Sequence, residues 1–267
     1  MVAFSAYQSK FIPIPMDNKG MITDILQKTL TTFKRHQLAF IYVVPTFQNP
    51  TGITMSIERR QMLLELATRY DLPILEDDAY YDLRYSGTPV KSIKSMDRDS
   101  KVIYTQTFSK ILAPGFRLGY VIGDREIIRK MTIAKQSIDV STNVFVQYIA
   151  AEYITSGLID KQLEKIKVMY KRKRDIMISA LTNHFPEKCS WTLPNGGMFI
   201  WVTLPSNIDT KQLFFEAIKQ KVAFVHGAAF HVTQEKQSTM RLNFTNTDDD
   251  KIEIGIKRLS TILNKKR

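Results

Sequence analysis

The segment that decides the fold is TFSKILAPGFRLG, residues 107–119. It follows an alternating stretch over residues 101–107 that predicts a β-strand, and it leads into a second predicted strand over residues 118–122. Lys110 therefore stands just beyond the end of a strand, with Ser109 beside it. In open α/β sheets, ligands bind beyond the carboxyl ends of the strands. The segment predicts a ligand site that includes Lys110.

The chain before this segment alternates apolar strands with amphipathic helices. Strands are predicted over residues 38–44 and 73–77, and a helix between them begins after the capping residue Ser56 and ends near Tyr70. Its predicted inner face consists of Met62, Leu63, Leu66 and Tyr70. A further helix, capped by Asp124, is predicted to end near Gln136. This alternation is typical of an α/β fold with a mostly parallel sheet.

The second half of the chain has a different pattern. A long helix over residues 158–183 is followed by mixed elements: strands over 198–202, 222–225 and 240–244, and helices over 210–219 and 248–263. This order predicts a small α+β domain. We expect the first domain to cover residues 1–160 and the second to cover residues 161–267.

The composition of the chain is that of an ordinary globular protein. Its 267 residues include 38 basic and 26 acidic side chains, a net charge of +12, and 44% are apolar, which excludes a disordered chain. Apolar stretches such as residues 40–44 are far too short to cross a bilayer, so we expect no membrane partner. The first ten residues lack the pattern of a signal peptide. The one cysteine, Cys189, favours a reducing compartment, and we expect the protein to be cytoplasmic.

The basic residues are scattered, apart from runs at residues 171–174 and 265–267. The first run lies in the long helix, where we expect most of its side chains to face the solvent, opposite an apolar face. Interleaved aromatic residues and zinc-finger spacings do not occur. We therefore expect no direct binding of nucleic acid and no metal site.

Polar or reactive side chains stand at three predicted strand ends: Asn49, Asp77 and Lys110. Each alone has a plain structural explanation: a tight turn, a solvated acidic corner and a surface lysine. Together they suggest one chemistry. A lysine in a partly desolvated pocket can react with an aldehyde, a carboxylate can hold a pyridine nitrogen protonated, and hydroxyl groups with a guanidinium can bind phosphate. These are the parts of a pyridoxal 5'-phosphate site.

Four segments, in order along the chain, carry a resemblance to a known family: PTFQNPTG at residues 45–52, ILEDDAY at 74–80, TFSKILAPGFRLG at 107–119 and MRLNF at 240–244. The chain resembles the class I/II aminotransferases, pyridoxal-phosphate enzymes of fold type I. Within that family it is similar to the aminoadipate/kynurenine-type branch and to the aminotransferase-like domains of GntR-type (MocR) regulators.

The resemblance assigns catalytic roles to Lys110, Asp77 and Tyr80. Lys110 would be the Schiff-base lysine and the base that moves the proton between substrate and cofactor. Asp77 would pair with the pyridine nitrogen, and it is preferred to Asp78 because the family pattern Asp-x-x-Tyr selects Asp77 and Tyr80. Tyr80 and Asn49 would hydrogen-bond the hydroxyl group of the cofactor ring.

The remaining roles concern two anionic groups. Thr107, Ser109 and Arg117 would bind the cofactor phosphate. Arg241 would clamp the α-carboxylate of the amino acid or 2-oxo acid substrate in a bidentate fork, with Asn49 also on the substrate side. Without the resemblance, Arg241 would pass for a cation on an edge strand.

Two further pairs of residues near these segments have structural interpretations. Gly196 and Gly197 are explained by a tight turn. Glu76 and Asp78 are expected to serve packing and local hydrogen bonds.

The resemblance also implies that family members have a large part of the major domain before the segment that begins at Met1. We therefore expect fold type I with a truncated major domain and a mostly parallel sheet, plus the small C-terminal α+β domain. Family members usually build their site at a homodimer interface, so a homodimer is expected. Residues 11–17 resemble a strand from the middle of the major domain.

Two functions from different classes follow from the resemblance. The first is an aminotransferase that passes an amino group between an amino acid and a 2-oxo acid, impaired to the extent that the missing part is needed. The second is the effector-binding and dimerising domain of a GntR/MocR-type regulator whose DNA-binding domain is absent here. A third interpretation is a remnant without function.

Overall fold

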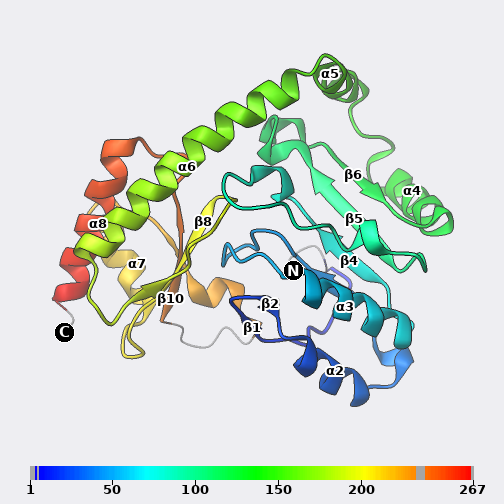
Figure 1. Ribbon diagram of the computed structural model, residues 1–267, viewed down its shortest axis with the longest axis horizontal. Helices are drawn as coiled ribbons and strands as arrows, with labels where there is room; N and C mark the ends of the chain where they lie inside the picture. The colour runs from blue at the N-terminus through cyan, green and yellow to red at the C-terminus, as the bar shows by residue number, and fades with distance from the viewer. Residues whose placement is uncertain (1–3, 5, 233–237, 266–267) are drawn as a thin grey trace.

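The computed structural model describes residue 4 and residues 6–232 and 238–265 (Figure 1). Two four-stranded sheets form its two halves, and the long helix α6 (Leu158–His184) extends from one half to the other. Within the described residues, no helix is both long and apolar enough to cross a membrane.

The sheet of the first half has the strand order β3-β4-β5-β6, formed by Ile41–Val43, Ile74–Asp77, Val102–Thr107 and Gly119–Ile122. β3, β4 and β5 are parallel, whereas β6 is antiparallel to β5. The mostly parallel sheet is therefore confirmed. β6 reverses direction because only short 3-10 turns, and no crossover helix, connect it to β5.

Helices α2 (Thr23–Thr31) and α3 (Ile57–Arg69) pack with this sheet around one apolar cluster. The capping role of Ser56 is confirmed, since its hydroxyl accepts a hydrogen bond from the Arg59 backbone N–H at 3.4 Å. The predicted inner face of α3 is wrong at Met62, which is 37% exposed. Leu63 and Leu66 are fully buried, so the inner face is centred on them.

Two short strands, β2 and β7, and two helices, α2 and α5, were not predicted. Of the strand expected over residues 11–17, residues 11–15 are not a strand, and only β1 (Met16–Asp17) pairs with β2 (Gly20–Met21) in a short hairpin. α4 (Arg125–Asp139) follows its predicted cap, Asp124, and is succeeded by the unpredicted helix α5 (Val144–Thr155). The other unpredicted strand, β7 (Ser190–Trp191), belongs to the second sheet.

The sheet of the second half is antiparallel, with the order β7-β8-β10-β9, formed by Ser190–Trp191, Phe199–Thr203, Thr239–Asn243 and Val225–His226. One face packs against α6, α7 (Thr210–Lys219) and α8 (Asp249–Asn264), which together enclose the largest apolar cluster. The predicted small α+β arrangement matches these elements. α6 contributes to clusters in both halves, and the division at residue 160 stays a prediction.

Two basic side chains of α6 depart from the expected solvent-facing pattern. The side chain of Arg174 is 11% exposed, and its Nη1 donates to the Pro194 carbonyl at 2.9 Å. Lys173 is only 9% exposed, and its ammonium donates to the backbone oxygens of Thr247 at 2.6 Å and Thr245 at 3.3 Å. These carbonyls lie just before α8. Lys173 thus ties α6 to the start of α8, while Lys171 and Arg172 face outward as predicted.

Candidate functional site

The predicted cofactor residues meet at one edge of the first sheet. β4 and β5 are parallel neighbours, with Asp77 level with Thr105. Asp77 ends β4, and Thr107 ends β5 one turn before Lys110. The carboxyl ends of parallel neighbours share one edge of a sheet, so these side chains are on the same side of the fold.

The three residues predicted to bind the cofactor phosphate lie around the 3-10 turn η4 (Phe108–Lys110). They are Thr107, Ser109 and Arg117. The Thr107 hydroxyl caps this turn by accepting from the Ser109 backbone N–H at 3.1 Å, and its Oγ1 is 3.0 Å from Ser109 Oγ. Antiparallel pairing of β5 with β6 continues through a bond from the Phe108 N–H to the Leu118 carbonyl at 3.0 Å. This pairing brings Arg117, an exposed residue, next to the turn. Its positive φ of 53° is the left-handed conformation that ends η5 (Pro114–Phe116).

Lys110 is the last residue of η4 and is half-buried. Among the residues that the structure describes, its ammonium forms no hydrogen bond or ion pair. An amine held at the end of a strand without a partner is accessible for reaction with a bound carbonyl compound.

Asp77 has a partner that the sequence analysis missed. Tyr42, in the middle of β3, donates its hydroxyl to Asp77 Oδ2 at 2.8 Å. Burial, reinforced by the negative charge of Asp77, raises the pKa of Tyr42 above its ordinary value. Tyr42 could have been noticed from its alternation with the buried Ile41 and Val43, which turns it to the opposite face of the sheet.

Tyr80 links this group electrostatically to the second half of the chain. It is 7% exposed, and burial raises its pKa, with a contribution from Asp77 in the same direction. The positive charge of Arg241 acts in the opposite direction. The phenol therefore lies within reach of both charges.

Arg241 comes from β10 and joins the two sheets. Its Nη1 donates to Asn49 Oδ1 at 2.7 Å, across 192 residues of sequence. Its guanidinium lies over the ring of Phe199, 4.1 Å from the centroid, and 5.0 Å from that of Phe230. Burial lowers the pKa of the guanidinium. Its Nε is buried with no described partner, so the group retains a donor for an anion.

Arg241 does not lie on an edge strand. β10 lies between β8 and β9, inside the second sheet. An arginine in an interior strand, bonded to the Asn49 turn, is held in place far more firmly than an edge cation.

The turn that carries Asn49 is fixed by Phe47, which is fully buried and has a φ of 48°. Gly196 and Gly197 lie directly against its ring, and a Cβ on Gly196 would come within 2.1 Å of Phe47 Cζ. The guanidinium of Arg84 covers the same ring, 4.6 Å from the centroid. The two glycines are therefore needed for close approach to Phe47, beyond the tight turn expected from the sequence.

Glu76 has the packing and hydrogen-bonding role expected of it, whereas Asp78 is buried but neither of its carboxylate oxygens has a hydrogen-bond partner among the described residues. Glu76 accepts hydrogen bonds from the backbone N–H groups of Ile93 and Lys94, both at 2.8 Å. Asp78 is buried near Arg60, whose guanidinium donates to the Pro45 carbonyl at 2.9 Å and so supports the start of the Asn49 turn. Both acids are fully buried.

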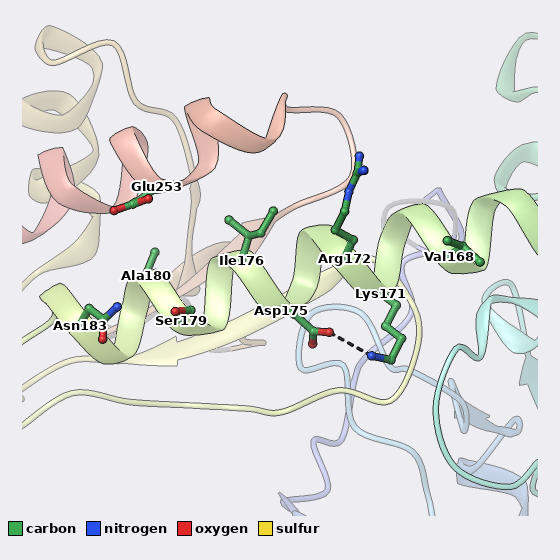
Figure 2. Close-up of a pocket in the computed structure, with 9 residues that line it drawn as sticks. All are labelled: Val168, Lys171, Arg172, Asp175, Ile176, Ser179, Ala180, Asn183 and Glu253. Atoms are coloured by element: carbon green, nitrogen blue, oxygen red, sulfur yellow. Dashed lines mark hydrogen bonds and ion pairs between the residues drawn. The ribbon is translucent and has the colours of Figure 1, made fainter.

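A groove of about 590 Å³ lies elsewhere, along α6 and beside Glu253 of α8 (Figure 2). Its rim is polar, with an ion pair between Lys171 Nζ and Asp175 Oδ2 at 3.1 Å. None of the predicted site residues lines it. The groove is thus separate from the strand-end site.

The strand-end residues suit a ligand with three kinds of group. Hydroxyls and a guanidinium gather at the end of β5, a carboxylate ends β4, and a partly unsatisfied guanidinium approaches from β10. An unpaired lysine amine lies at the same sheet edge. These donors fit a phosphorylated pyridine aldehyde together with a carboxylate substrate. They define an α/β protein of the pyridoxal-phosphate-binding type.

Comparison with known proteins identifies the family. Residues 2–259 match the family described as aminotransferase class I and II, and the chain belongs to this family. It is 48% identical to an aromatic-amino-acid aminotransferase 1 of Thermococcus litoralis, over 97% of this chain and 62% of that protein. It is 32% identical to an uncharacterized HTH-type transcriptional regulator YdfD of Bacillus subtilis, over 97% of this chain and 53% of that protein.

The fold is that of a solved relative. The crystal structure of Pyrococcus horikoshii kynurenine aminotransferase, in complex with PMP, KYN and KYA, matches with a TM-score of 0.96 and 50% identity. The match covers 99% of this chain and 66% of that one. The predicted α/β fold of type I pyridoxal-phosphate transferases is confirmed. The chain spans about two thirds of the length of these aminotransferases.

Proposed function

We propose that this chain binds pyridoxal 5'-phosphate and contributes to amino-group transfer between an amino acid and a 2-oxo acid. The observation that carries the proposal is the hydrogen bond from Arg241 to Asn49. It brings a carboxylate-binding arginine from the second sheet to the edge of the first, where Lys110, Asp77 and Tyr80 already stand. The names of the two similar aminotransferases support the same activity.

The cofactor, when bound, supplies a carbonyl that captures the amino group and a ring that accepts electrons from the substrate carbon. Lys110 provides the amine that holds the cofactor and then moves a proton at its Nζ. Asp77 keeps the pyridine nitrogen protonated, and Tyr42 orients this carboxylate. Tyr80 and Asn49 hold the ring hydroxyl.

The remaining residues bind the cofactor phosphate and orient the substrate α-carboxylate. Thr107, Ser109 and Arg117 hold the phosphate by two hydroxyls and one guanidinium. Arg241 orients the substrate α-carboxylate, and its contact with Asn49 aims the guanidinium at the sheet edge. The rings of Phe199, which is buried, and Phe230, which is half-buried, cover the guanidinium, limit its contact with water and strengthen the ionic contact.

The partners follow from the same proposal. The substrates are a small amino acid and a 2-oxo acid, and the chain acts as a homodimer in the cytoplasm without direct contact to nucleic acid or membrane. The single cysteine supports a reducing compartment. The resemblance to a helix-turn-helix regulator supports an alternative, an effector-binding and dimerising domain that senses a ligand at this site.

The experiment that tests the proposal is covalent mapping. The purified chain is mixed with pyridoxal phosphate, its visible spectrum is recorded, and the adduct is reduced with borohydride and located by peptide mass spectrometry. We expect one labelled peptide, with the pyridoxyl group on Lys110, and its loss in Lys110→Ala. A label spread over surface lysines, or one retained in Lys110→Ala, would refute the assignment. Amino-acid assays of the chain with bound pyridoxal phosphate but without borohydride, with and without added 2-oxo acid, then separate the enzyme from the regulator.

A further inference from the structure

A cavity of about 580 Å³ lies between residues 81–89, which follow β4, and the helix α6. Arg84 and two tyrosines, Tyr81 and Tyr85, line it from the first half of the chain, and Lys167 and Lys171 line it from α6. None of the described residues that line it belongs to the strand-end site. Its volume is within the range of pockets that hold small organic molecules. The cavity is therefore a second candidate binding site.

Arg84 brings to this cavity a charge that no described acid neutralises. Among the residues that the structure describes, its guanidinium forms no ion pair, and its Nη1 donates to the Ser86 carbonyl oxygen at a long 3.4 Å. Its Nη2 is buried and has no described partner. The group lies over the ring of Phe47, which holds the cation in place but supplies no anion. Burial lowers the pKa of Arg84, so a bound anion would offset a real cost.

The two lysines of α6 are only weakly engaged by acids. Lys167 pairs with Glu164 at 3.2 Å, and Lys171 pairs with Asp175 at 3.1 Å. The two acidic side chains are 74% and 47% exposed. Ion pairs this exposed to water contribute little free energy. Both ammonium groups can therefore turn to a ligand in the cavity at small cost.

The acids that line the cavity leave its charge positive. Three basic side chains line it, against two acidic ones, Asp82 and Glu164. Asp82 accepts a hydrogen bond from Gln106 Nε2 at 2.5 Å, and burial, which disfavours its negative charge, raises its pKa. Glu164 is the exposed partner of Lys167. An anion is therefore the ligand that this lining favours.

We propose that the cavity beside Arg84 binds a phosphate group, either free phosphate or the phosphate of a small phosphorylated molecule. A guanidinium fork and ammonium groups are the donors that bind phosphate in proteins. A phosphate group carries about two negative charges near neutral pH, which suits one unpaired cation and two weakly paired ones. The rings of Tyr81 and Tyr85 offer contact area to the organic part of a phosphorylated molecule. This site is independent of the proposed function.

Calorimetric titration of the full chain with inorganic phosphate and with phenyl phosphate tests the proposal. The titrations use an Arg117→Gln background, which removes the guanidinium from the predicted cofactor-phosphate site. We expect one anion to bind per chain. Tighter binding of phenyl phosphate would identify a phosphorylated molecule as the source of the phosphate group, and equal affinities would identify free phosphate. Either result supports the site.

Two variants of the lining locate the bound anion. Arg84→Gln removes the unpaired cation, and we expect at least about tenfold weaker binding. Because Arg84 also covers Phe47, its loss can weaken the fold. The double variant Lys167→Gln/Lys171→Gln therefore removes the two ammonium groups from the partly exposed face of α6, with about tenfold weaker binding expected.

Lys161→Gln/Lys165→Gln is the matched control. Both lysines are exposed on α6 and lie outside the cavity, so this variant loses the same charge and should bind like its parent. Equal weakening in the two double variants would mean that the general positive charge of α6 attracts the anion, and it would overturn the site. Absence of binding to the chain, or binding that neither lining variant weakens, would overturn it too. These outcomes do not depend on whether Lys110 takes the pyridoxyl label.

Discussion

Asp77 and Asp78 are adjacent in the sequence but experience different surroundings. Asp77 accepts a hydrogen bond from Tyr42 at the edge of the sheet, whereas both carboxylate oxygens of Asp78 are buried. Burial raises the pKa of Asp78 to about 7, and the nearby Glu76 adds to this rise, while Thr46 and Arg60 oppose it. The family pattern that selects Asp77 for the cofactor thus agrees with the physical difference between the two acids.

The raised pKa of Asp78 predicts a specific pH dependence of stability. The folded state retains the proton of this carboxyl up to about pH 7, whereas the unfolded chain releases it near the ordinary aspartate pKa of 3.8. The contribution of Asp78 to the free energy of unfolding is therefore full below about pH 4 and is lost as the pH rises toward 7. Asp78→Asn stays neutral, so its stability relative to the unmodified chain should rise with pH, by at most about 1.4 kcal/mol per pH unit.

Urea unfolding at pH 5, 6, 7 and 8 measures this difference. Burial also raises the pKa of Glu76, which gives a slope of the same sign, but Glu76 is present in both proteins and its effect cancels in the comparison. Parallel curves for the two proteins over this range would show that Asp78 is ionised in the folded chain.

Lys173 gives a second prediction at the residue scale. Its buried ammonium donates to the backbone oxygens of Thr245 and Thr247, whereas Lys171, two residues earlier in the same helix, is exposed and pairs with Asp175. Lys173→Met leaves two carbonyls without their donor and should lower the free energy of unfolding by about 1–3 kcal/mol. Lys171→Met should change it by no more than about 0.5 kcal/mol.

Chemical denaturation of both variants, with circular dichroism as the readout, compares them directly. Equal effects of the two substitutions would mean that Lys173 is solvated like Lys171. That run was expected to face solvent because helical periodicity reports only on a residue's own helix, and the acceptors of Lys173 come from a segment more than 70 residues away.

At the scale of elements, the contact of Gly196 with Phe47 connects the second half of the chain to the turn of Asn49. A Cβ at Gly196 would be 2.2 Å from Phe47 Cε2 and 2.6 Å from the Leu83 carbonyl oxygen. Gly196→Ala should therefore displace the Phe47 ring and lower the free energy of unfolding by about 1–3 kcal/mol. Because Phe47 supports Asn49, the variant should also weaken binding of carboxylates at Arg241.

Gly255→Ala is the matched control. Gly255 lies within α8, and nothing is within 4 Å of its added Cβ, so the substitution should stabilise the chain by about 0.5–1 kcal/mol. Thermal unfolding of both variants gives opposite shifts if the contact is as tight as described. A stable Gly196→Ala variant with unchanged carboxylate binding would show that the loop can move away without cost.

Local patterns predicted most elements but not how they meet. The helix over 210–219 and the cap at Ser56 follow from periodicity and capping chemistry, and the structure has both. α5 was missed because its sequence is apolar on nearly all sides and lacks the polar stripe that marks an amphipathic helix. How these elements pack against one another depends on tertiary contacts, which local patterns do not report.

The candidate site likewise has features that could be predicted from the sequence and features that could not. Its strand-end residues could be predicted because parallel neighbours bring their carboxyl ends to one edge. The bond from Tyr42 to Asp77 and the rings beside Arg241 could not, since each depends on how separate segments pack. The interior position of β10 could not be predicted either, because strand order in a sheet is not encoded in the pattern of one strand.

The molecule as a whole exposes an unusual amount of apolar surface in three successive elements, β6, α4 and α5, the last two in the upper right of Figure 1. α4 has no fully buried residue, and all four residues of β6 are exposed. The exposed large apolar side chains of these elements and of Val140 between α4 and α5, which we call the apolar surface, are Tyr120, Val121, Ile122, Met131, Ile133, Ile138, Val140, Val144, Phe145, Tyr148 and Ile154. Patches of this kind mark interaction surfaces or promote aggregation.

The apolar surface predicts that the chain associates with itself in solution, as the proposed homodimer requires. Phe145 and Tyr148 are 72% and 73% exposed, so charges placed there should not disturb the fold but should oppose apolar contact. In sedimentation velocity at increasing concentration, the unmodified chain should form larger species, and Phe145→Glu/Tyr148→Glu should weaken this association on the order of tenfold, ~1.4 kcal/mol. Ile254→Glu, at a 43% exposed position on α8, is the control and should associate like the unmodified chain. A chain that stays monomeric at every concentration, or a control that dissociates as readily as the double variant, would mean that this surface is not where two copies meet.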